Sequence, residues 1–197
     1  EYYGETMDLA RAFGEKYGSE GVVYALGGDG TLNEVAKGVY GTGAYMGALP
    51  CGTANDFCKT LYGKGVGYEE ILPATLEPTK GKTDLIRIND GLSLNVTSFG
   101  LDTVILKKVY ELLEKHPGLG AMAYLFAVLP SLGKDRNVNL YYEVEDLEGT
   151  VHRGEGAFTL GTIANGGYYG SGFQPAPDAV LDDGILRMAL AEAMPLH

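Results

Sequence analysis

The sequence has few cysteines, few basic residues and no long hydrophobic run, and each shortage excludes a class of protein. The cysteines, Cys51 and Cys58, have no partners at metal-ligand spacing, which favours a reducing, cytoplasmic setting over a secreted, disulfide-bonded protein. The longest uncharged stretch, residues 118–133, falls short of the about 20 apolar residues that a membrane-spanning helix needs. No signal peptide opens the chain. We therefore expect a cytoplasmic protein without a membrane span.

Acidic side chains outnumber basic ones by 26 to 15, which gives a net charge of −11. Such a charge repels nucleic acid and anionic membrane surfaces, so nucleic acid is not an expected partner. A hydrophobic content of 45% is ordinary for a packed protein, and 197 residues suffice for one large or two small domains. The 30 glycines follow no repeat period, which predicts many short elements joined by turns.

The first 80 residues have the pattern of an α/β domain. Apolar residues recur every three or four positions in the predicted helices, and short apolar runs mark the predicted strands. The expected elements are a helix over 7–17, a strand over 22–26, a helix over 32–39, a strand over 45–49, and helices over 54–61 and 69–76. A strand, a helix and a strand in succession indicate that the two strands pair in parallel.

Beyond Pro78 the pattern changes to mainly antiparallel β-structure, beginning with a hairpin signal at Asn89-Asp90-Gly91. The expected elements are strands over 83–88 and 92–98, a helix over 102–115, and strands over 138–144, 150–153 and 157–164. We predict an α/β nucleotide-binding domain at 1–80 and a β-sandwich domain at 81–197, with the boundary near 78–83. A ligand cleft is expected between the two domains.

A glycine-rich corner follows the first predicted strand. Gly27, Gly28 and Gly30 can adopt backbone angles that other residues avoid, and they let a polyphosphate approach main-chain N–H groups. Asp29 is the charge available there to hold a cation. A tight turn without a ligand is the alternative interpretation.

A second corner, residues 52–56, follows the second predicted strand. Thr53, Asn55 and Asp56 supply a hydroxyl, an amide and a carboxylate, which could also simply cap the helix that starts there. Ligands of parallel sheets bind beyond the carboxyl ends of the strands, so both corners are expected to face one pocket.

The two corners carry a family resemblance. Gly27-Gly-Asp-Gly-Thr-Leu-Asn-Glu34, followed by Pro50-Cys-Gly-Thr-Ala-Asn-Asp-Phe57, resembles the catalytic domain of diacylglycerol and sphingosine kinases, and most closely the bacterial soluble lipid kinases. Two later elements, Asn165-Gly-Gly and the segment 177–185, match the family in the same order. NAD kinases and phosphofructokinases share only the first signature.

The resemblance implies an ATP-dependent lipid kinase that uses Mg²⁺ and phosphorylates a lipid acceptor with a free hydroxyl, such as diacylglycerol, in phospholipid metabolism. Asp29 is then the catalytic residue, nearest to the catalytic Mg²⁺. The candidate cofactor-binding residues are Gly27, Gly28, Asp29, Gly30, Thr31, Leu32, Asn33, Glu34, Gly52, Thr53, Asn55 and Asp56. The alternatives are an NAD kinase-like phosphotransferase and an inactive nucleotide-binding fragment.

The resemblance also implies a second, structural Mg²⁺ in the later half of the chain. Its ligands map onto the Asp183 carboxylate and the backbone carbonyls of Val180 and Ile185. An oxygen-only set suits a hard cation. The alternative is an ordinary β-turn built on Asp182-Asp183-Gly184.

Family members are longer than this chain at both ends. The family's leading phosphate loop and its glutamate proposed as general base have no counterparts here, and Glu192 lies in the wrong context for that base. The sequence fits either a fragment of a longer kinase, which we favour, or a natural short form that has lost activity. For these 197 residues alone we expect weak or no activity. An uncovered sheet edge predicts a marginally stable or oligomeric species, for example a homodimer, unless other segments cover it.

Residues 107–136 carry a net positive charge in an otherwise acidic chain, with Lys107, Lys108 and Lys115 near their start. We hypothesise that this stretch makes a peripheral membrane contact or admits the lipid. The alternative is a helix packed on the second domain with its lysines in water.

Overall fold

The computed structural model describes residues 4–119, 122–123, 126–127 and 137–193. The chain divides into two compact units. Unit 1 contains residues 1–97 and 164–187, and unit 2 contains residues 98–163 and 188–197. The predicted boundary near 78–83 falls within unit 1, because the first segment of that unit runs on to Thr97.

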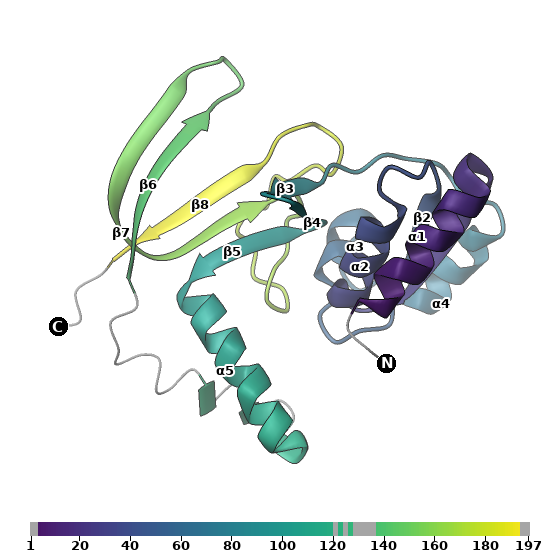
Figure 1. Cartoon of the computed structure of the whole chain (residues 1–197), viewed down its shortest axis with the longest axis horizontal. Coiled ribbons are helices and arrows are strands. Elements are labelled where there is room, and N and C mark those ends of the chain that lie inside the picture. Colours follow the sequence, from purple (N-terminus) through teal and green to yellow (C-terminus); the bar gives the residue numbers. More distant parts are fainter. Residues whose placement is uncertain (1–3, 120–121, 124–125, 128–136, 194–197) are drawn as a thin grey trace. The chain divides into compact units, whose positions relative to one another are not determined.

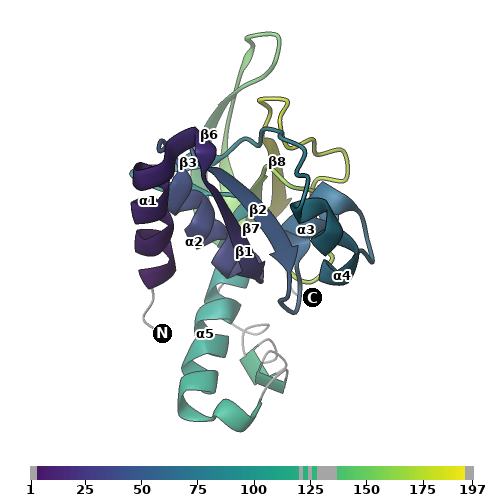
Figure 2. The same ribbon diagram turned by 90° about the vertical axis from the view of Figure 1, so that its right-hand side faces the viewer.

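Unit 1 is built on a parallel pair of strands, as predicted (Figure 1). Its first elements are α1 (Glu5–Tyr17), β1 (Val22–Gly27), α2 (Asp29–Val39), β2 (Tyr45–Pro50), α3 (Asp56–Tyr62) and α4 (Tyr68–Ile71). The register runs from Val22 opposite Tyr45 to Gly27 opposite Pro50. Figure 2 shows α1 and α2 on one side of this strand pair and α3 and α4 on the other.

The core of unit 1 lies between these layers. Ala25 of β1, Leu32 and Val35 of α2, and Phe57 of α3 are almost fully buried and pack in one cluster. Helices α1 and α2 cross closely because Gly38 has no side chain, and a Cβ there would collide with the backbone of α1. The buried face of α2 is the one that the three- to four-residue periodicity predicted. In α1 the same spacing marked Ala10, which is buried, but also Phe13 and Tyr17, which are 37% and 46% exposed.

The remainder of unit 1 is a short hairpin and a returning loop. Strands β3 (Ile86–Ile88) and β4 (Gly91–Ser93) are antiparallel, and Asn89 at their turn has a φ of 50°. This agrees with the predicted hairpin, although the strands are shorter than expected. The chain re-enters unit 1 at Ala164, and the loop up to Arg187 packs Leu181 into the core cluster.

Unit 2 is an antiparallel sheet region with one long helix. Its elements are the end of β5 (Val96–Gly100), α5 (Leu101–Lys115), a 3-10 turn (Pro117–Leu119), β6 (Val138–Glu145), β7 (Val151–Ala164) and β8 (Arg187–Glu192). The strand order is β5-β7-β6, and β8 also pairs with β7. Gly100, with a φ of 97°, makes the sharp turn from β5 into α5.

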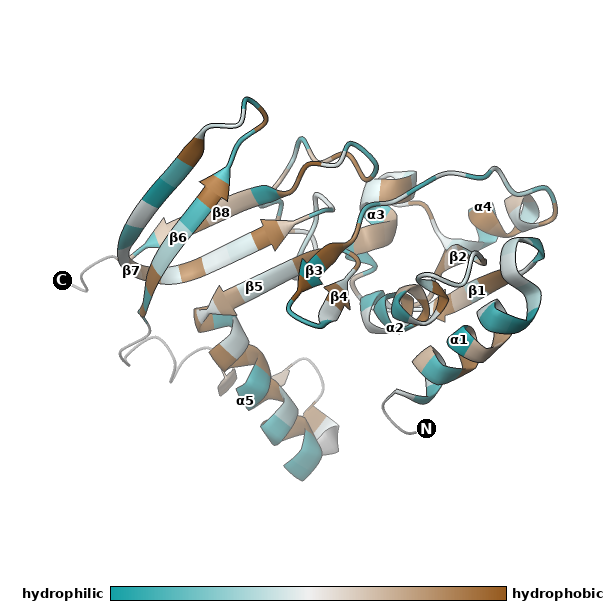
Figure 3. Ribbon diagram, turned by 45° about the horizontal axis from the view of Figure 1, so that its top comes forward, coloured by the Kyte–Doolittle hydropathy of each residue, from teal (hydrophilic) through white to brown (hydrophobic). Residues whose placement is uncertain are grey.

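Strands β6 and β7 form a long hairpin, in register from Val138 opposite Phe158 to Glu145 opposite Val151. Polar and apolar residues alternate along β6, as Figure 3 shows. The sequence pattern predicted two strands at 150–153 and 157–164, but β7 is one strand, because Gly154 and Gly156 stay in the ladder opposite Tyr142 and Leu140. Strand β8 was not predicted.

No helix among the residues described here is long and apolar enough to cross a membrane.

Candidate active site

The two glycine corners lie side by side at the carboxyl edge of the parallel strands. Gly27 pairs with Pro50, and the ladder continues one step further because the Cys51 N–H donates to the Gly27 carbonyl at 3.0 Å. Beyond this bond the two backbones touch, since a Cβ at Gly52 would collide with the Cα of Gly28. Glycine is therefore needed at position 52, and a Cβ at Gly28 would also be a tight fit, 3.3 Å from the Cα of Gly52.

Asp29 joins the two corners. One oxygen of its carboxylate accepts the Asp56 N–H at 3.0 Å, and the other accepts the Phe57 N–H at 2.9 Å. These are the first amides of α3, so a side chain at the start of α2 caps a different helix. The described part of the chain places no cation within ion-pair distance of Asp29, and each carboxylate oxygen keeps further acceptor capacity.

The start of α2 offers amide groups to an anion. Its first helical hydrogen bond runs from the Leu32 N–H to the Gly28 carbonyl at 3.1 Å, so the amides of residues 29–31 precede the helical ladder. The helix dipole favours negative charge at the same place. Leu32 itself is only 1% exposed, and its side chain belongs to the core.

Asn55 shapes the second corner without capping α3. Its backbone has a φ of 53°, and its side chain exchanges two hydrogen bonds with Gly52, from the Gly52 N–H and to the Gly52 carbonyl, both at 2.8 Å. This closed loop presents Thr53 at the surface. The capping role that the sequence allowed for Thr53, Asn55 or Asp56 is taken by Asp29 instead.

Asp56 is buried, with 4% of its surface exposed, and both its carboxylate oxygens are engaged. Oδ1 forms an ion pair with Lys59 Nζ at 2.7 Å, and Oδ2 accepts the Ser171 N–H at 2.9 Å. The Lys59 ammonium also lies 6.0 Å from the centre of the Tyr168 ring. Asp56 therefore fixes the returning loop against the second corner, whereas Asp29 links the first corner to the second.

Sequence reasoning missed Lys59 and Ser171. Lys59 lies three residues after Asp56, which is a helical ion-pair spacing and a usable signal. Ser171 lies 115 residues away in sequence, and no local pattern could have identified it.

Two asparagines, Asn33 on α2 and Asn165 on the returning loop, both bind the segment around Leu94. Asn33 accepts the Leu94 N–H at 3.0 Å. Asn165 is fully buried, and its side-chain amide donates to the carbonyls of Asp84, at 2.7 Å, and Leu94, at 3.1 Å. The side-chain oxygen of Asn165 has no hydrogen-bond partner among the described residues. Asn165 of the Asn165-Gly-Gly motif therefore has a structural role: its buried amide links two chain segments by hydrogen bonds. Glycine is required at 166 because a Cβ there would collide with Asn95.

Two of the three donors predicted for a second Mg²⁺, those of Asp183 and Ile185, are engaged by an arginine, whereas no contact among the described residues joins the Val180 carbonyl to it. Arg187 forms an ion pair with Asp183 at 2.8 Å and also donates to the carbonyl of Ile185 at 2.8 Å. Hydrogen bonds from Arg187 are the main cause that lowers the pKa of Asp183. A divalent ion at these donors would have to compete with the guanidinium for the Asp183 carboxylate and the Ile185 carbonyl. Across the described residues, no group of three or more His, Cys, Asp or Glu side chains is arranged to hold a metal ion.

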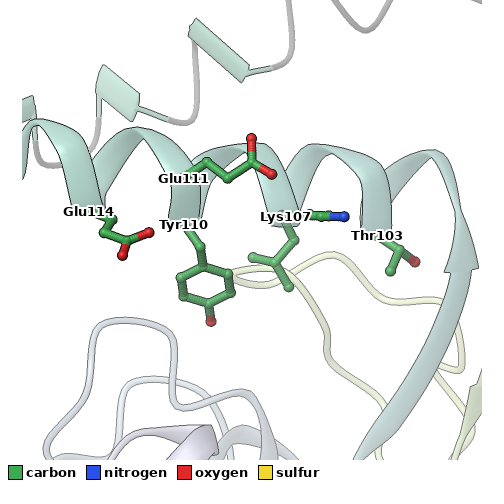
Figure 4. Close-up of a pocket in the computed structure, with 6 residues that line it drawn as sticks. Thr103, Lys107, Tyr110, Glu111 and Glu114 are labelled. Atoms are coloured by element: carbon green, nitrogen blue, oxygen red, sulfur yellow. The ribbon is translucent and has the colours of Figure 1, made fainter.

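The basic stretch predicted to meet lipid is described only in part. Figure 4 shows Lys107, Tyr110 and two glutamates on one open face of α5. Tyr110 is 65% exposed. Residues 120–121, 124–125 and 128–136 lie outside the described residues, so the lipid contact stays a prediction.

An α/β unit with paired glycine corners at its carboxyl edge, followed by an antiparallel sheet, defines the class of this protein. The chain belongs to the diacylglycerol kinase family, in its YegS-like branch. Residues 1–88 match the diacylglycerol kinase catalytic domain, and residues 95–196 match the YegS C-terminal NAD kinase beta sandwich-like domain. The resemblance noted from the two corners is thus confirmed.

Individual relatives agree with this assignment. The chain is 34% identical over 174 residues to a probable lipid kinase YegS-like protein of Pseudomonas putida, which covers 87% of this chain and 56% of that protein. A relative of the same description from Xanthomonas oryzae pv. oryzae is 32% identical over 196 residues, covering 91% of this chain and 61% of that protein. The chain therefore spans about 60% of the length of these curated relatives.

A solved structure supports the fold. The crystal structure of a diacylglycerol kinase from Bacillus anthracis aligns with a TM-score of 0.68 over 98% of this chain and 60% of that one, at 23% identity.

Proposed function

We propose that this chain carries the nucleotide site of an ATP-dependent lipid kinase that transfers the γ-phosphate to a lipid hydroxyl, with diacylglycerol as the acceptor. The observation that carries the proposal is the Asp29 carboxylate, which binds the first amides of α3 and so holds the two corners together. Family membership supports the same reaction class.

The chemistry of the corners suits a triphosphate. Amides of residues 29–31 can donate to phosphate oxygens, and the hydroxyls of Thr31 and Thr53 lie on the two corners. Phosphoryl transfer depends mainly on positioning and on stabilising charge, so the site needs no nucleophilic side chain.

Asp29 is the residue we assign to Mg²⁺. Its carboxylate makes no ion pair within the described chain and keeps acceptor capacity for a hard cation, whereas Asp56 is already neutralised by Lys59. A bound Mg²⁺ supplies charge neutralisation at the phosphates. The protein's own contribution is to orient the carboxylate through two backbone amides and to hold the phosphate-binding amides in place.

A transfer assay tests the proposal. The chain is incubated with radiolabelled ATP, Mg²⁺ and a panel of lipids in mixed micelles, and the products are separated by thin-layer chromatography. We expect at most a slow transfer of label to diacylglycerol with the wild type, because the family's phosphate loop and general base have no counterparts in these residues, and none with Asp29→Asn. Asp182→Asn, which changes an exposed aspartate outside the corners, is the matched control and should keep the wild-type rate.

The alternatives give different outcomes in the same assay. Label transferred to NAD and not to lipid would identify an NAD kinase-like enzyme. ATP binding by calorimetry without transfer to any acceptor would identify an inactive nucleotide-binding protein. No ATP binding at all would contradict the proposal.

A further inference from the structure

A loop of unit 1, residues 178–187, closes around the guanidinium group of Arg187. Nη1 donates to Asp183 Oδ1 at 3.0 Å and to the Ile185 carbonyl at 2.8 Å. Nη2 donates to Asp183 Oδ2 at 2.8 Å and to the Asp178 carbonyl at 3.1 Å. The Arg187 side chain is 18% exposed and that of Asp183 is 22% exposed, although Asp183 as a whole residue lies at the surface.

These acceptors form an oxygen cage around a positive charge. The planar guanidinium meets the carboxylate with two parallel hydrogen bonds, which is the strongest geometry for such a pair. Asp183 and Ile185 are two of the three residues predicted to hold a second Mg²⁺. Adding a divalent ion beside the bound guanidinium would bring two positive centres onto one carboxylate, and displacing the guanidinium would break four hydrogen bonds.

We propose that Arg187 is the resident cation of this loop and takes the place of a structural metal ion. The loop then folds without a divalent cation. Any Mg²⁺ that this protein requires acts elsewhere, and this inference does not rest on the proposed kinase reaction.

The arginine cage orders a chain of contacts that leads toward the candidate site. Asp183 also accepts the Ile185 N–H at 3.0 Å, which sets the turn. The preceding amide, of Gly184, donates to the Asp84 carboxylate at 2.7 Å, and the Asp84 N–H donates to the Leu181 carbonyl at 2.6 Å. Asn165 holds the carbonyl of the same Asp84 at 2.7 Å. The Arg187 contacts thus hold one end of the returning loop, and Asn165 holds the other end to the same Asp84.

The melting temperature of the chain, without nucleotide, tests the proposal. We expect the same melting temperature in EDTA as in about 10 mM MgCl₂ or CaCl₂, because the loop binds no divalent cation and therefore gains no stability from one. A site occupied to a hundredfold excess over its dissociation constant would raise the melting temperature of a chain of this size by about 5 °C or more. Such a rise in the wild type that disappears in Asp183→Asn would overturn the proposal.

A rise that persists unchanged in Asp183→Asn arises at another site and agrees with the proposal. Arg187→Met should lower the melting temperature in EDTA, whereas Asp182→Asn, an exposed neighbour, should leave it unchanged. If Arg187→Met melts in EDTA at the same temperature as the wild type, Arg187 does not stabilise the loop and the proposal is contradicted.

Hydrogen exchange gives a local measurement that needs no variant. The amides of Gly184 and Ile185 should be equally protected with EDTA and with Mg²⁺, because their acceptors are ordered by the guanidinium. Protection that is present only with Mg²⁺ would show that the metal, not Arg187, orders the loop.

Discussion

Replacing Asp29 should destabilise the chain as well as remove a ligand group. Asp29→Ala leaves the amides of Asp56 and Phe57 at the start of α3 without acceptors. Loss of a helix cap costs about 1 kcal/mol, and loss of hydrogen bonds to a charged group costs about 1.5–3 kcal/mol. We therefore expect a decrease of about 2 kcal/mol in the free energy of unfolding. Asp29→Asn keeps one acceptor oxygen, so its free energy of unfolding should fall by about half as much as that of Asp29→Ala.

Urea denaturation followed by circular dichroism measures this difference. With about 2–4 °C of melting temperature per kcal/mol for a chain of this size, Asp29→Ala should melt about 4–8 °C below the wild type. Asp182→Ala serves as the matched control, because Asp182 is exposed and lies outside the corners. A decrease below about 0.5 kcal/mol for Asp29→Ala, with an unchanged denaturant slope, would refute the capping role and the link between the corners.

Three further predictions concern single positions. Gly52→Ala should disrupt the contact with Gly28 and weaken ATP binding by calorimetry at least tenfold, whereas Gly67→Ala, which has open space, should not. Asn165→Ala removes buried hydrogen bonds to two carbonyls and should lower the free energy of unfolding, measured in urea, by about 2–4 kcal/mol. A decrease under about 1 kcal/mol would contradict the structural role of Asn165. Exposed Cys51 should react rapidly with a thiol reagent at pH 8, but Cys58 only after unfolding. Burial first, and then the charge of Asp29, raise the pKa of Cys58 from 9.0 to about 12, so its contribution to stability is complete below pH 9 and is lost as the pH rises toward 12. Equal reaction rates of the two thiols would contradict this.

Much of the α/β unit could be predicted from sequence, because its signals are local. The stripe of Leu32 and Val35 identified α2, and the strand-helix-strand succession indicated the parallel pairing that the register confirms. Parallel pairing then predicted that the corners at Gly28 and Gly52 would meet. The role of Asp29 as a cap for α3 could not be derived, because it depends on a contact across 27 residues.

Other features depend on contacts that no local pattern encodes. Ser171 reaches Asp56 only because the chain returns to unit 1 after β7. Ligand spacing around Asp183 cannot distinguish a metal ion from the side chain of Arg187, since both bind the same oxygens. The continuity of β7 through Gly154 and Gly156 depends on its partner β6, which keeps both glycines in the ladder.

The most direct test of the central claim is the hydrogen-exchange footprint of Mg·ATP on this chain. We predict that the nucleotide slows exchange at residues 28–34 and at residues 52–57 together, because Asp29 holds the two corners in one site. Protection of only one corner, or of neither while ATP is bound, would contradict the account.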